Sequence, residues 1–213
     1  MKKGKISKLI FGCMVYASVL SFSGQTGTAQ DLPRAATPKT MVKAMDNYLK
    51  DVENSKQDLH SIMVLQHGKV IAAKWMGEGD ENKPHVLNSV SKTFTATAIG
   101  FAVAEGKLKV TDKVISFFPD KLPAEISPNL KNMEIRHLLT MSCGHDADPT
   151  GLVRKQEGTD WVQGFLAIPV VHEPGTFFVY NSLGTYMLSA IVQKVTGQKV
   201  IDYLTPRLFQ PLG

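Results

Sequence analysis

The sequence predicts a mixed α/β fold of the α+β kind, in which one antiparallel hairpin precedes a mainly helical body. Two apolar runs at residues 60–66 and 70–75 flank His67-Gly68-Lys69, which is the pattern of a β-hairpin. Beyond the hairpin, residues 91–105 and 183–195 have the length and apolar content of helices, and a glycine stands at or near the end of each. No repeat or low-complexity tract interrupts this pattern, so we expect one globular unit.

The remaining elements follow from the same signals. An amphipathic helix is expected before the hairpin, at residues 37–56, where methionine, leucine and valine side chains share one side. The chain from 108 to 132 is rich in proline and is expected to be irregular. Further helices are expected at residues 135–141, 160–166 and 200–208, with an extended segment at residues 175–179.

Residues 1–29 have the pattern of a secretory signal peptide. Four lysines precede an apolar run at residues 9–22, and Gly27-Thr28-Ala29 supplies the small residues of a cleavage site. Because the run is short and interrupted, the pattern favours a signal peptide over a retained membrane anchor, and over a lipid anchor at Cys13. We therefore expect an exported protein, periplasmic or secreted, whose folded part covers residues 30–213.

The net charge of +5 arises mostly in that first segment. The chain has 24 basic and 19 acidic residues, and residues 1–29 contain four lysines and no acid. Residues 30–213 are thus left with 20 basic and 19 acidic residues, a net charge of +1. No basic cluster interleaved with aromatic residues remains, so the sequence argues against a nucleic-acid partner. Any membrane contact is expected only through the N-terminal segment.

Four potential metal ligands gather within six residues, and they are Cys143, His145, Asp146 and Asp148. Their spacing fits no standard zinc pattern, and Gly144 and Pro149 indicate a turn. Since Cys13 leaves with the signal peptide, Cys143 also has no partner for a disulfide. No metal and no other cofactor is expected.

The first turn of the helix after Asn88 carries the strongest chemical signal. A serine there is ordinary, because its hydroxyl can satisfy a free backbone N–H. Lys92 is different, since a lysine in the first turn opposes the helix dipole and this helix leads into the core. Side chains at i and i+3 share one face, so Lys92 can reach the Ser89 hydroxyl and accept its proton. The backbone N–H of Ser89 can stabilise the oxyanion that then develops. Ser-x-x-Lys also arises by chance in a chain of this length.

A second short motif, Tyr180-Asn181-Ser182, stands 91 residues beyond Ser89 and directly before a predicted helix. Two interpretations are open from the residues alone. Ser182 could cap the helix while Tyr180 fills the core. Alternatively, both side chains could belong to the same site as Ser89.

These residues resemble a known family. Residues 88–95, Asn-Ser-Val-Ser-Lys-Thr-Phe-Thr, are similar to the nucleophile segment of the serine β-lactamase and penicillin-binding-protein family, in particular its cephalosporinase-like and esterase branch. Three further segments resemble the same family in the same order, at residues 105–120, 135–141 and 173–197. The resemblance covers the chain from about residue 61 to residue 213.

The resemblance implies a two-lobed β-lactamase-like fold, with a helical lobe and an antiparallel sheet flanked by helices. It also implies a serine hydrolase that forms an acyl-enzyme on a small ester, peptide, amide or lactam substrate. In that mechanism Ser89 is the nucleophile, Lys92 is its partner and Tyr180 is the second proton-transfer group. Ser182 lines the substrate site, and no cofactor is needed.

The sequence departs from the family pattern in two places. Members that hydrolyse penicillins or cephalosporins usually have asparagine where Ser182 stands, so an esterase, amidase or peptidase is favoured here. The family also has a third motif, a lysine- or histidine-led tripeptide ending in glycine, on a strand well downstream. We therefore expect residues 30–213 to be the N-terminal portion of the domain, truncated before that strand. The alternative to an enzyme is a binding or sensing module, or an inactive fragment, that keeps the fold.

Overall fold

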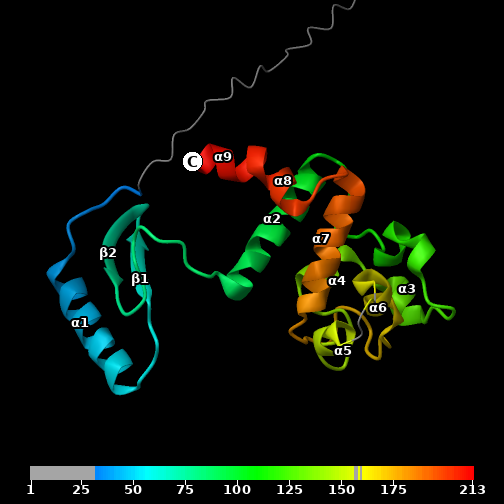
Figure 1. Cartoon of the computed structure of the whole chain (residues 1–213), viewed down its shortest axis with the longest axis horizontal. Helices are drawn as coiled ribbons and strands as arrows, with labels where there is room; N and C mark the ends of the chain where they lie inside the picture. The colour runs from blue at the N-terminus through cyan, green and yellow to red at the C-terminus, as the bar shows by residue number, and fades with distance from the viewer. Residues whose placement is uncertain (1–31, 156–157, 159) are drawn as a thin grey trace, which may run out of the picture.

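The computed structural model describes residues 32–155, 158 and 160–213. The predicted signal peptide lies outside them. An N-terminal region of one helix and one hairpin stands beside a helical body, and the chain leading into α2 joins the two (Figure 1). The α+β arrangement predicted from the sequence is confirmed, with a small antiparallel sheet followed by many helices.

The hairpin forms where the alternating pattern predicted it. Strands β1 (Ser61–Gln66) and β2 (Lys69–Trp75) pair antiparallel, with a register irregularity between Val64 and Leu65. His67 and Gly68 connect them, and both have positive φ, at 49° and 73°. A two-residue turn with positive φ at both positions matches the right-handed twist of the strands, which explains the tight connection.

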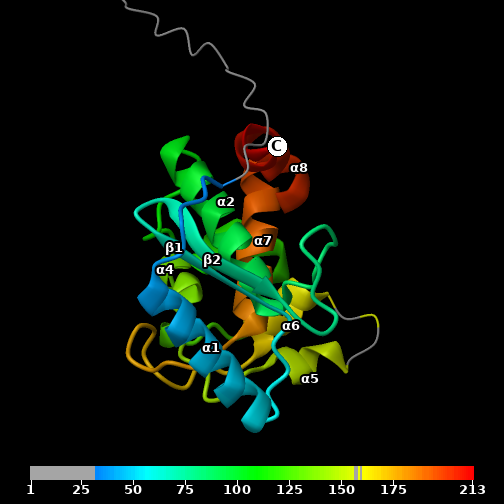
Figure 2. The same ribbon diagram turned by 90° about the vertical axis from the view of Figure 1, so that its left-hand side faces the viewer.

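The helix before the hairpin, α1 (Lys39–Asn54), has no buried residue. It lies alongside the hairpin in Figure 2, where both face the viewer in front of the body. β1 is likewise mostly exposed, while β2 buries Val70 and Ile71. The N-terminal region thus presents much of its apolar surface to solvent.

The helical body begins with a short 3₁₀ turn that continues into α2. Its helices and helical turns are η1 (Asn88–Ser91), α2 (Lys92–Ala104), η2 (Val114–Phe117), η3 (Pro119–Lys121), α3 (Pro128–Asn132), α4 (Ile135–Leu139), α5 (Thr150–Arg154), α6 (Trp161–Ala167), α7 (Ser182–Thr196), α8 (Val200–Leu204), η4 (Thr205–Phe209) and α9 (Gln210–Leu212). Helices α2 and α7 pack against each other at its centre. Gly106 and Gly197 follow these two helices with φ of 69° and 72°, the left-handed conformation expected after a helix end.

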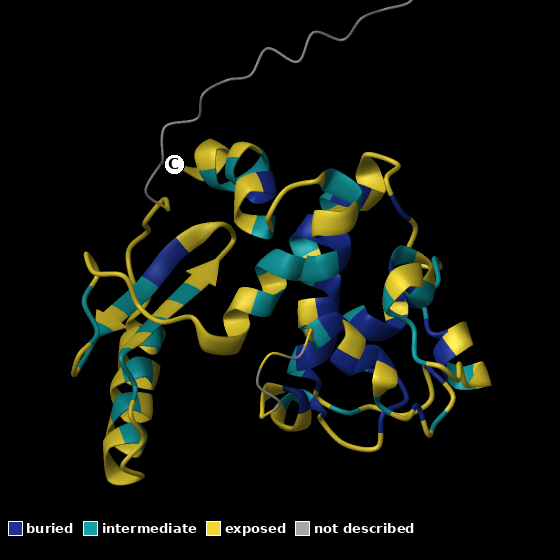
Figure 3. Ribbon diagram, turned by 45° about the vertical axis from the view of Figure 1, so that its right-hand side comes forward, coloured by how far each residue is buried: buried dark blue, intermediate teal, exposed yellow. Residues whose placement is uncertain are grey.

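Nearly all of the buried apolar side chains belong to this body (Figure 3). Helix α7 contributes Leu183, Met187, Leu188, Ile191 and Val192, which recur every three to four residues and form one stripe. Helix α2 contributes Ala98, Ile99 and Ala102, and the two buried alanines are small enough to allow the two helices to approach closely. The contact between these helices therefore fixes where their N-terminal ends lie, and both ends carry predicted site residues.

Three details differ from the sequence prediction. Helix α2 buries one stripe and leaves Ala96 and Gly100 exposed, although small and apolar side chains stand on every side of it and favour complete burial. The chain from 108 to 132 is not wholly irregular, because it forms η2, η3 and α3. The helix expected at residues 200–208 changes after Leu204 into the π-helical turn η4. Among the described helices, none combines the length and the apolar character that crossing a membrane requires.

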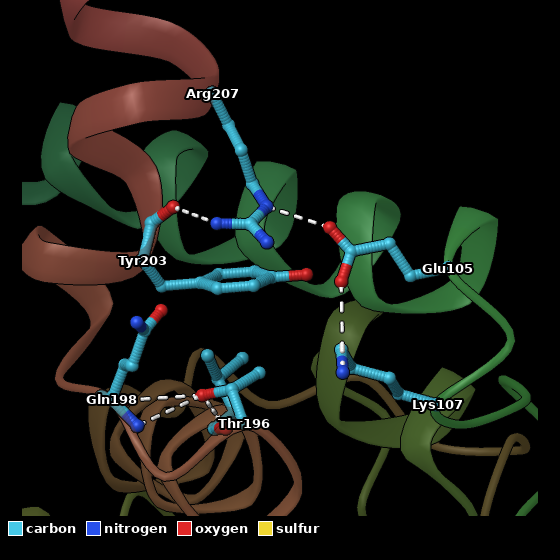
Figure 4. Close-up of polar contacts among 7 residues, drawn as sticks. Glu105, Lys107, Thr196, Gln198, Tyr203 and Arg207 are labelled. Carbon is cyan, nitrogen blue, oxygen red and sulfur yellow. Dashed lines mark hydrogen bonds and ion pairs between the residues drawn. The ribbon is translucent and has the colours of Figure 1, made fainter.

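A polar cluster ties the end of α2 to α8 and η4 (Figure 4). The Arg207 Nε donates to Glu105 Oε1 at 2.6 Å, and the guanidinium lies 4.0 Å from the centre of the Tyr203 ring. The Lys107 ammonium lies 3.8 Å from the other oxygen of Glu105. The cluster holds the C-terminal end of α2 in place, opposite the end that carries Ser89.

Candidate active site

Ser89 lies in the 3₁₀ turn η1 directly before α2, and its side chain is exposed. Asn88, which precedes it, has φ of 45°, a left-handed conformation that asparagine tolerates better than most residues. The Ser91 hydroxyl donates to the Asn88 carbonyl at 2.6 Å and holds this turn closed. The turn therefore presents the Ser89 hydroxyl outward at the N-terminal end of α2.

The structure brings Ser89, Lys92 and Tyr180 together. The Lys92 Nζ donates to the Ser89 Oγ at 3.0 Å, as the i, i+3 spacing predicted. The Tyr180 hydroxyl donates to the same Ser89 oxygen at 2.5 Å, across 91 residues of sequence. The Lys92 Nζ also lies 5.2 Å from the centre of the Tyr180 ring. Lys92 is half-buried, so its charge is neither sealed in the core nor free in solvent.

Charge and hydrogen bonding around Tyr180 favour its ionised form. The pKa of the Tyr180 phenol is lowered, first by its hydrogen bond with Ser89 and next by Lys92, and burial opposes this only in part. Ser182 makes a smaller hydrogen-bonding contribution in the same direction, which places its hydroxyl near the phenol. A phenol with a lowered pKa ionises more readily, and beside a serine hydroxyl its ionised form can accept a proton and return it.

The extended segment before Tyr180 is held by the loop after α4. The Val179 N–H donates to the Met141 carbonyl at 3.0 Å, and the Gly175 N–H donates to the Ser142 carbonyl at 2.8 Å. Gly175 has φ of 96°, and a side chain there would meet the His137 ring at 3.3 Å. A glycine is therefore required at this turn, and the turn aims the segment towards Ser89.

Asn181 caps helix α7. Its side-chain Oδ1 accepts from the Gly184 N–H at 2.8 Å, and the residue is 1% exposed. The alternative that Ser182 is only the helix cap is thus wrong. Ser182 is half-buried, and its hydroxyl lies near the Tyr180 phenol.

Sequence reasoning missed His145 as part of this assembly. His145 is 1% exposed, its ring meets Phe165 edge to face at 4.9 Å, and its Nδ1 lies 3.0 Å from the Asn181 Nδ2. Burial lowers the pKa of His145 to about 4. The preference of asparagine for helix N-caps could have identified Asn181, but no local signal links it to a residue 36 positions earlier.

The four residues considered as metal ligands do not converge. Cys143 is buried, and burial raises the pKa of its thiol to about 12, while Asp146 and Asp148 are exposed. Asp148 instead accepts from the Thr150 backbone N–H at 3.0 Å, at the start of α5. Within residues 32–155, 158 and 160–213, no group of three or more such side chains is placed to hold a metal ion.

A hollow of about 450 Å³ lies beside the hairpin. Its charged lining is already paired, since Arg34 contacts Glu81 at 2.6 Å. His60 likewise lies 3.1 Å from both Asp58 and His85. Its lining includes none of the residues that gather around Ser89.

A family model described as Beta-lactamase matches residues 55–213 of this sequence. The chain belongs to the Beta-lactamase family. Among curated proteins, it is 26% identical over 164 residues to "Protein flp" of Staphylococcus aureus (strain MW2). The aligned residues cover 71% of this chain and 33% of that protein.

Solved structures show the same fold. The octameric penicillin-binding protein homologue from Pyrococcus abyssi matches with a TM-score of 0.61 and 25% identity, over 81% of this chain and 43% of that one. EstCE1, described as a hydrolase with promiscuous acyltransferase activity, matches with a TM-score of 0.63 and 23% identity, over 81% and 51% of the two chains. This chain spans about a third of the length of its Staphylococcus aureus relatives.

Proposed function

We propose that the protein is a serine hydrolase that acts through an acyl-enzyme, with Ser89 as the nucleophile. One observation carries the proposal. The Ser89 Oγ lies within hydrogen-bonding distance of the Lys92 Nζ, which can stabilise negative charge there, and of the Tyr180 hydroxyl, which can move its proton. The lowered pKa of Tyr180 and the membership of the Beta-lactamase family support the same proposal.

The geometry suggests an order of steps. The Ser89 Oγ attacks the carbonyl carbon of the substrate while its proton passes to the ionised Tyr180, and the Lys92 ammonium stabilises the negative charge nearby. Tyr180 then returns the proton to the leaving alcohol or amine as the acyl bond breaks, which leaves an ester on Ser89. Water attacks that ester while Tyr180 again takes its proton. Tyr180 returns that proton to the Ser89 Oγ as the acyl–oxygen bond breaks, which releases the acid product and restores free Ser89. The backbone N–H of Ser89 is proposed as one donor to the oxyanion.

The alternative of a binding or sensing module explains the fold but not this arrangement. Such a module has no need for a tyrosine and a lysine directed at one exposed serine. No ordinary packing role accounts for the three side chains either, since Ser89 is exposed and Tyr180 is 45% exposed. We therefore favour the enzyme.

Covalent labelling tests the nucleophile. A fluorophosphonate probe should label the intact gene product at Ser89, and Ser89→Ala should abolish labelling. Lys92→Ala should slow it by roughly a hundredfold or more, since it removes the ammonium that donates to the Ser89 Oγ and stabilises the negative charge beside it. Ser116→Ala is the matched control, because the Ser116 hydroxyl is already bonded to the Lys113 carbonyl within η2. Labelling that persists in Ser89→Ala would refute the assignment.

Tyr180→Phe separates proton transfer from packing. The variant keeps the ring and loses the hydroxyl that meets the Ser89 Oγ. The turnover number for an aryl ester should fall by roughly a hundredfold or more, with little change in melting temperature. An unchanged turnover number would remove Tyr180 from the mechanism while leaving Ser89 in place.

We further propose that esters and simple amides or peptides are preferred over lactams. Ser182 stands where lactam-hydrolysing relatives have asparagine, and a hydroxyl offers one donor where a carboxamide offers two donors and an acceptor. Short aryl esters should be hydrolysed faster than a chromogenic cephalosporin. Efficient cephalosporin turnover would contradict this preference, and Ser182→Asn should move the ratio towards the cephalosporin.

Export to the periplasm or the cell exterior is proposed from residues 1–29 alone. The mass of the mature N-terminus tests it. A product that begins near Gln30 supports cleavage, and one that retains Met1 or the apolar run contradicts it.

A further inference from the structure

His145 is the most completely enclosed histidine that the structure describes, and the mechanism above does not use it. It belongs to the loop between α4 and α5, and it reaches the N-terminal end of α7 through Asn181. Only one peptide bond separates Asn181 from Tyr180.

The hydrogen-bond pattern fixes the roles of both side chains. The Asn181 Oδ1 accepts from the Gly184 N–H, so the amide nitrogen must be the atom that faces the His145 Nδ1. An amide nitrogen only donates, so the His145 Nδ1 must accept. That requires a neutral ring with its hydrogen on Nε2, in agreement with a pKa that burial lowers to about 4.

This tautomer has a cost. The His145 Nε2 is enclosed and has no hydrogen-bond partner among the described residues. A buried donor without a partner destabilises a protein, because the group loses its hydrogen bonds to water and gains none in return. An apolar residue of similar size would avoid that cost and would still pack against Phe165. The feature that an apolar residue could not supply is the acceptor at Nδ1.

We propose that His145 is a positioning residue for Tyr180, acting through the side chain of Asn181. His145 holds the Asn181 amide in the rotamer that caps α7, and the capped turn keeps the Tyr180 hydroxyl 2.5 Å from the Ser89 Oγ. The Leu183 N–H is held separately by the Thr150 Oγ1 at 2.9 Å, so the helix start itself has a second support. Loss of His145 therefore displaces the Tyr180 hydroxyl from Ser89, while the start of α7 remains folded. This inference rests on the proposed serine hydrolase function.

His145→Leu and His145→Gln test it on the intact protein with an aryl ester. The leucine variant leaves the Asn181 amide nitrogen without an acceptor, so the turnover number should fall about tenfold to a hundredfold with KM little changed. Glutamine can offer its carbonyl oxygen to the same amide, so His145→Gln should restore most of that loss. Fluorophosphonate labelling of Ser89 should follow the same order.

His137→Gln is the matched control. His137 is also a buried histidine, but its Nδ1 accepts from the Glu134 N–H within the capping box of α4. The His137→Gln variant should have a lower melting temperature, while the turnover number of the folded protein stays nearly unchanged. Equal turnover in the parent and His145→Leu, or equal losses in the leucine and glutamine variants, would overturn the positioning role. Failure of the parent itself to label at Ser89 would instead refute the proposed function.

Discussion

The N-terminal region and the helical body reach their structures by different means. In the region of α1, β1 and β2, the described residues with buried apolar side chains are Val70 and Ile71. In the body, the buried stripe of α7 meets that of α2 in a continuous core (Figure 3). The hairpin is therefore specified by local signals, its alternating pattern and its two-residue turn, whereas the body is specified by packing between distant segments. Ser89, Lys92 and Tyr180 all belong to the body, which can hold them to a fixed geometry.

The largest expected difference in stability is between the same isoleucine-to-alanine substitution made in the body and in the N-terminal region. Ile191 is fully buried in α7, and Ile62 is half-buried in β1. Ile191→Ala should lower the free energy of unfolding by about 2–5 kcal/mol, because it removes buried methyl groups and leaves a cavity. Ile62→Ala should cost less than about 1 kcal/mol, since that side chain loses little contact.

Urea denaturation of both variants measures this difference. Ile62→Val serves as the control for β-propensity, because it keeps the branched side chain that favours a strand. Equal losses at positions 62 and 191 would mean that the hairpin is packed as firmly as the body, and the contrast between the regions would fail.

Two arginine–glutamate pairs offer a finer comparison. Arg207–Glu105 and Arg34–Glu81 both have a nitrogen–oxygen distance of 2.6 Å. The side chains of the first pair are 29% and 32% exposed, and those of the second are 56% and 50% exposed. Arg207 also stacks on the buried Tyr203 ring (Figure 4). Double-mutant cycles should give a coupling energy of about 1 kcal/mol for the body pair and about 0–0.5 kcal/mol for the N-terminal pair.

A salt series provides the internal check on these cycles. Raising the salt concentration should reduce the coupling of the exposed pair Arg34–Glu81 more than that of Arg207–Glu105, because exposed charges are screened more strongly. A larger coupling energy in the N-terminal pair would contradict the view that packing around Arg207 strengthens its ion pair.

The Arg207–Glu105 pair also predicts how stability depends on pH. The hydrogen bond from Arg207 is the main reason that the pKa of Glu105 lies below its ordinary value of 4.5. A carboxylate whose pKa is lower in the folded state stabilises the fold above its unfolded pKa, and that contribution disappears as the pH falls through the folded pKa. Glu105→Gln should therefore reduce the fall in stability below pH 4.5 and change little of the pH dependence above it. Melting temperatures measured from about pH 7 to about pH 3 check this, and an unaltered acid profile would contradict it.

Local sequence patterns predicted most helices and the hairpin, and within the candidate site they predicted the contact between Ser89 and Lys92. The hairpin, α1 and α7 have local periodicity, and the Ser89–Lys92 contact follows from i, i+3 spacing in one helical turn. The contact of Tyr180 with Ser89 rested on family resemblance, because no local pattern brings together residues 91 positions apart. His145 was missed for the same reason, and Gly144 and Pro149 near it in sequence indicated only a turn. The buried side of α2 could not be chosen from its uniformly apolar composition, since only the position of α7 decides it.

The smallest expected effect lies on α1. Val42 is 46% exposed on that helix, and Val192 is fully buried on α7. Val42→Ala should change the free energy of unfolding by less than about 0.5 kcal/mol, because alanine's higher helix propensity offsets the little contact that is lost. Val192→Ala, which removes the same atoms from the core, should cost about 1–3 kcal/mol. Chemical denaturation of the two variants compares them directly. A loss at position 42 above about 1 kcal/mol would show that α1 is covered in solution, so that the N-terminal region shares in a core and the two regions no longer differ in kind.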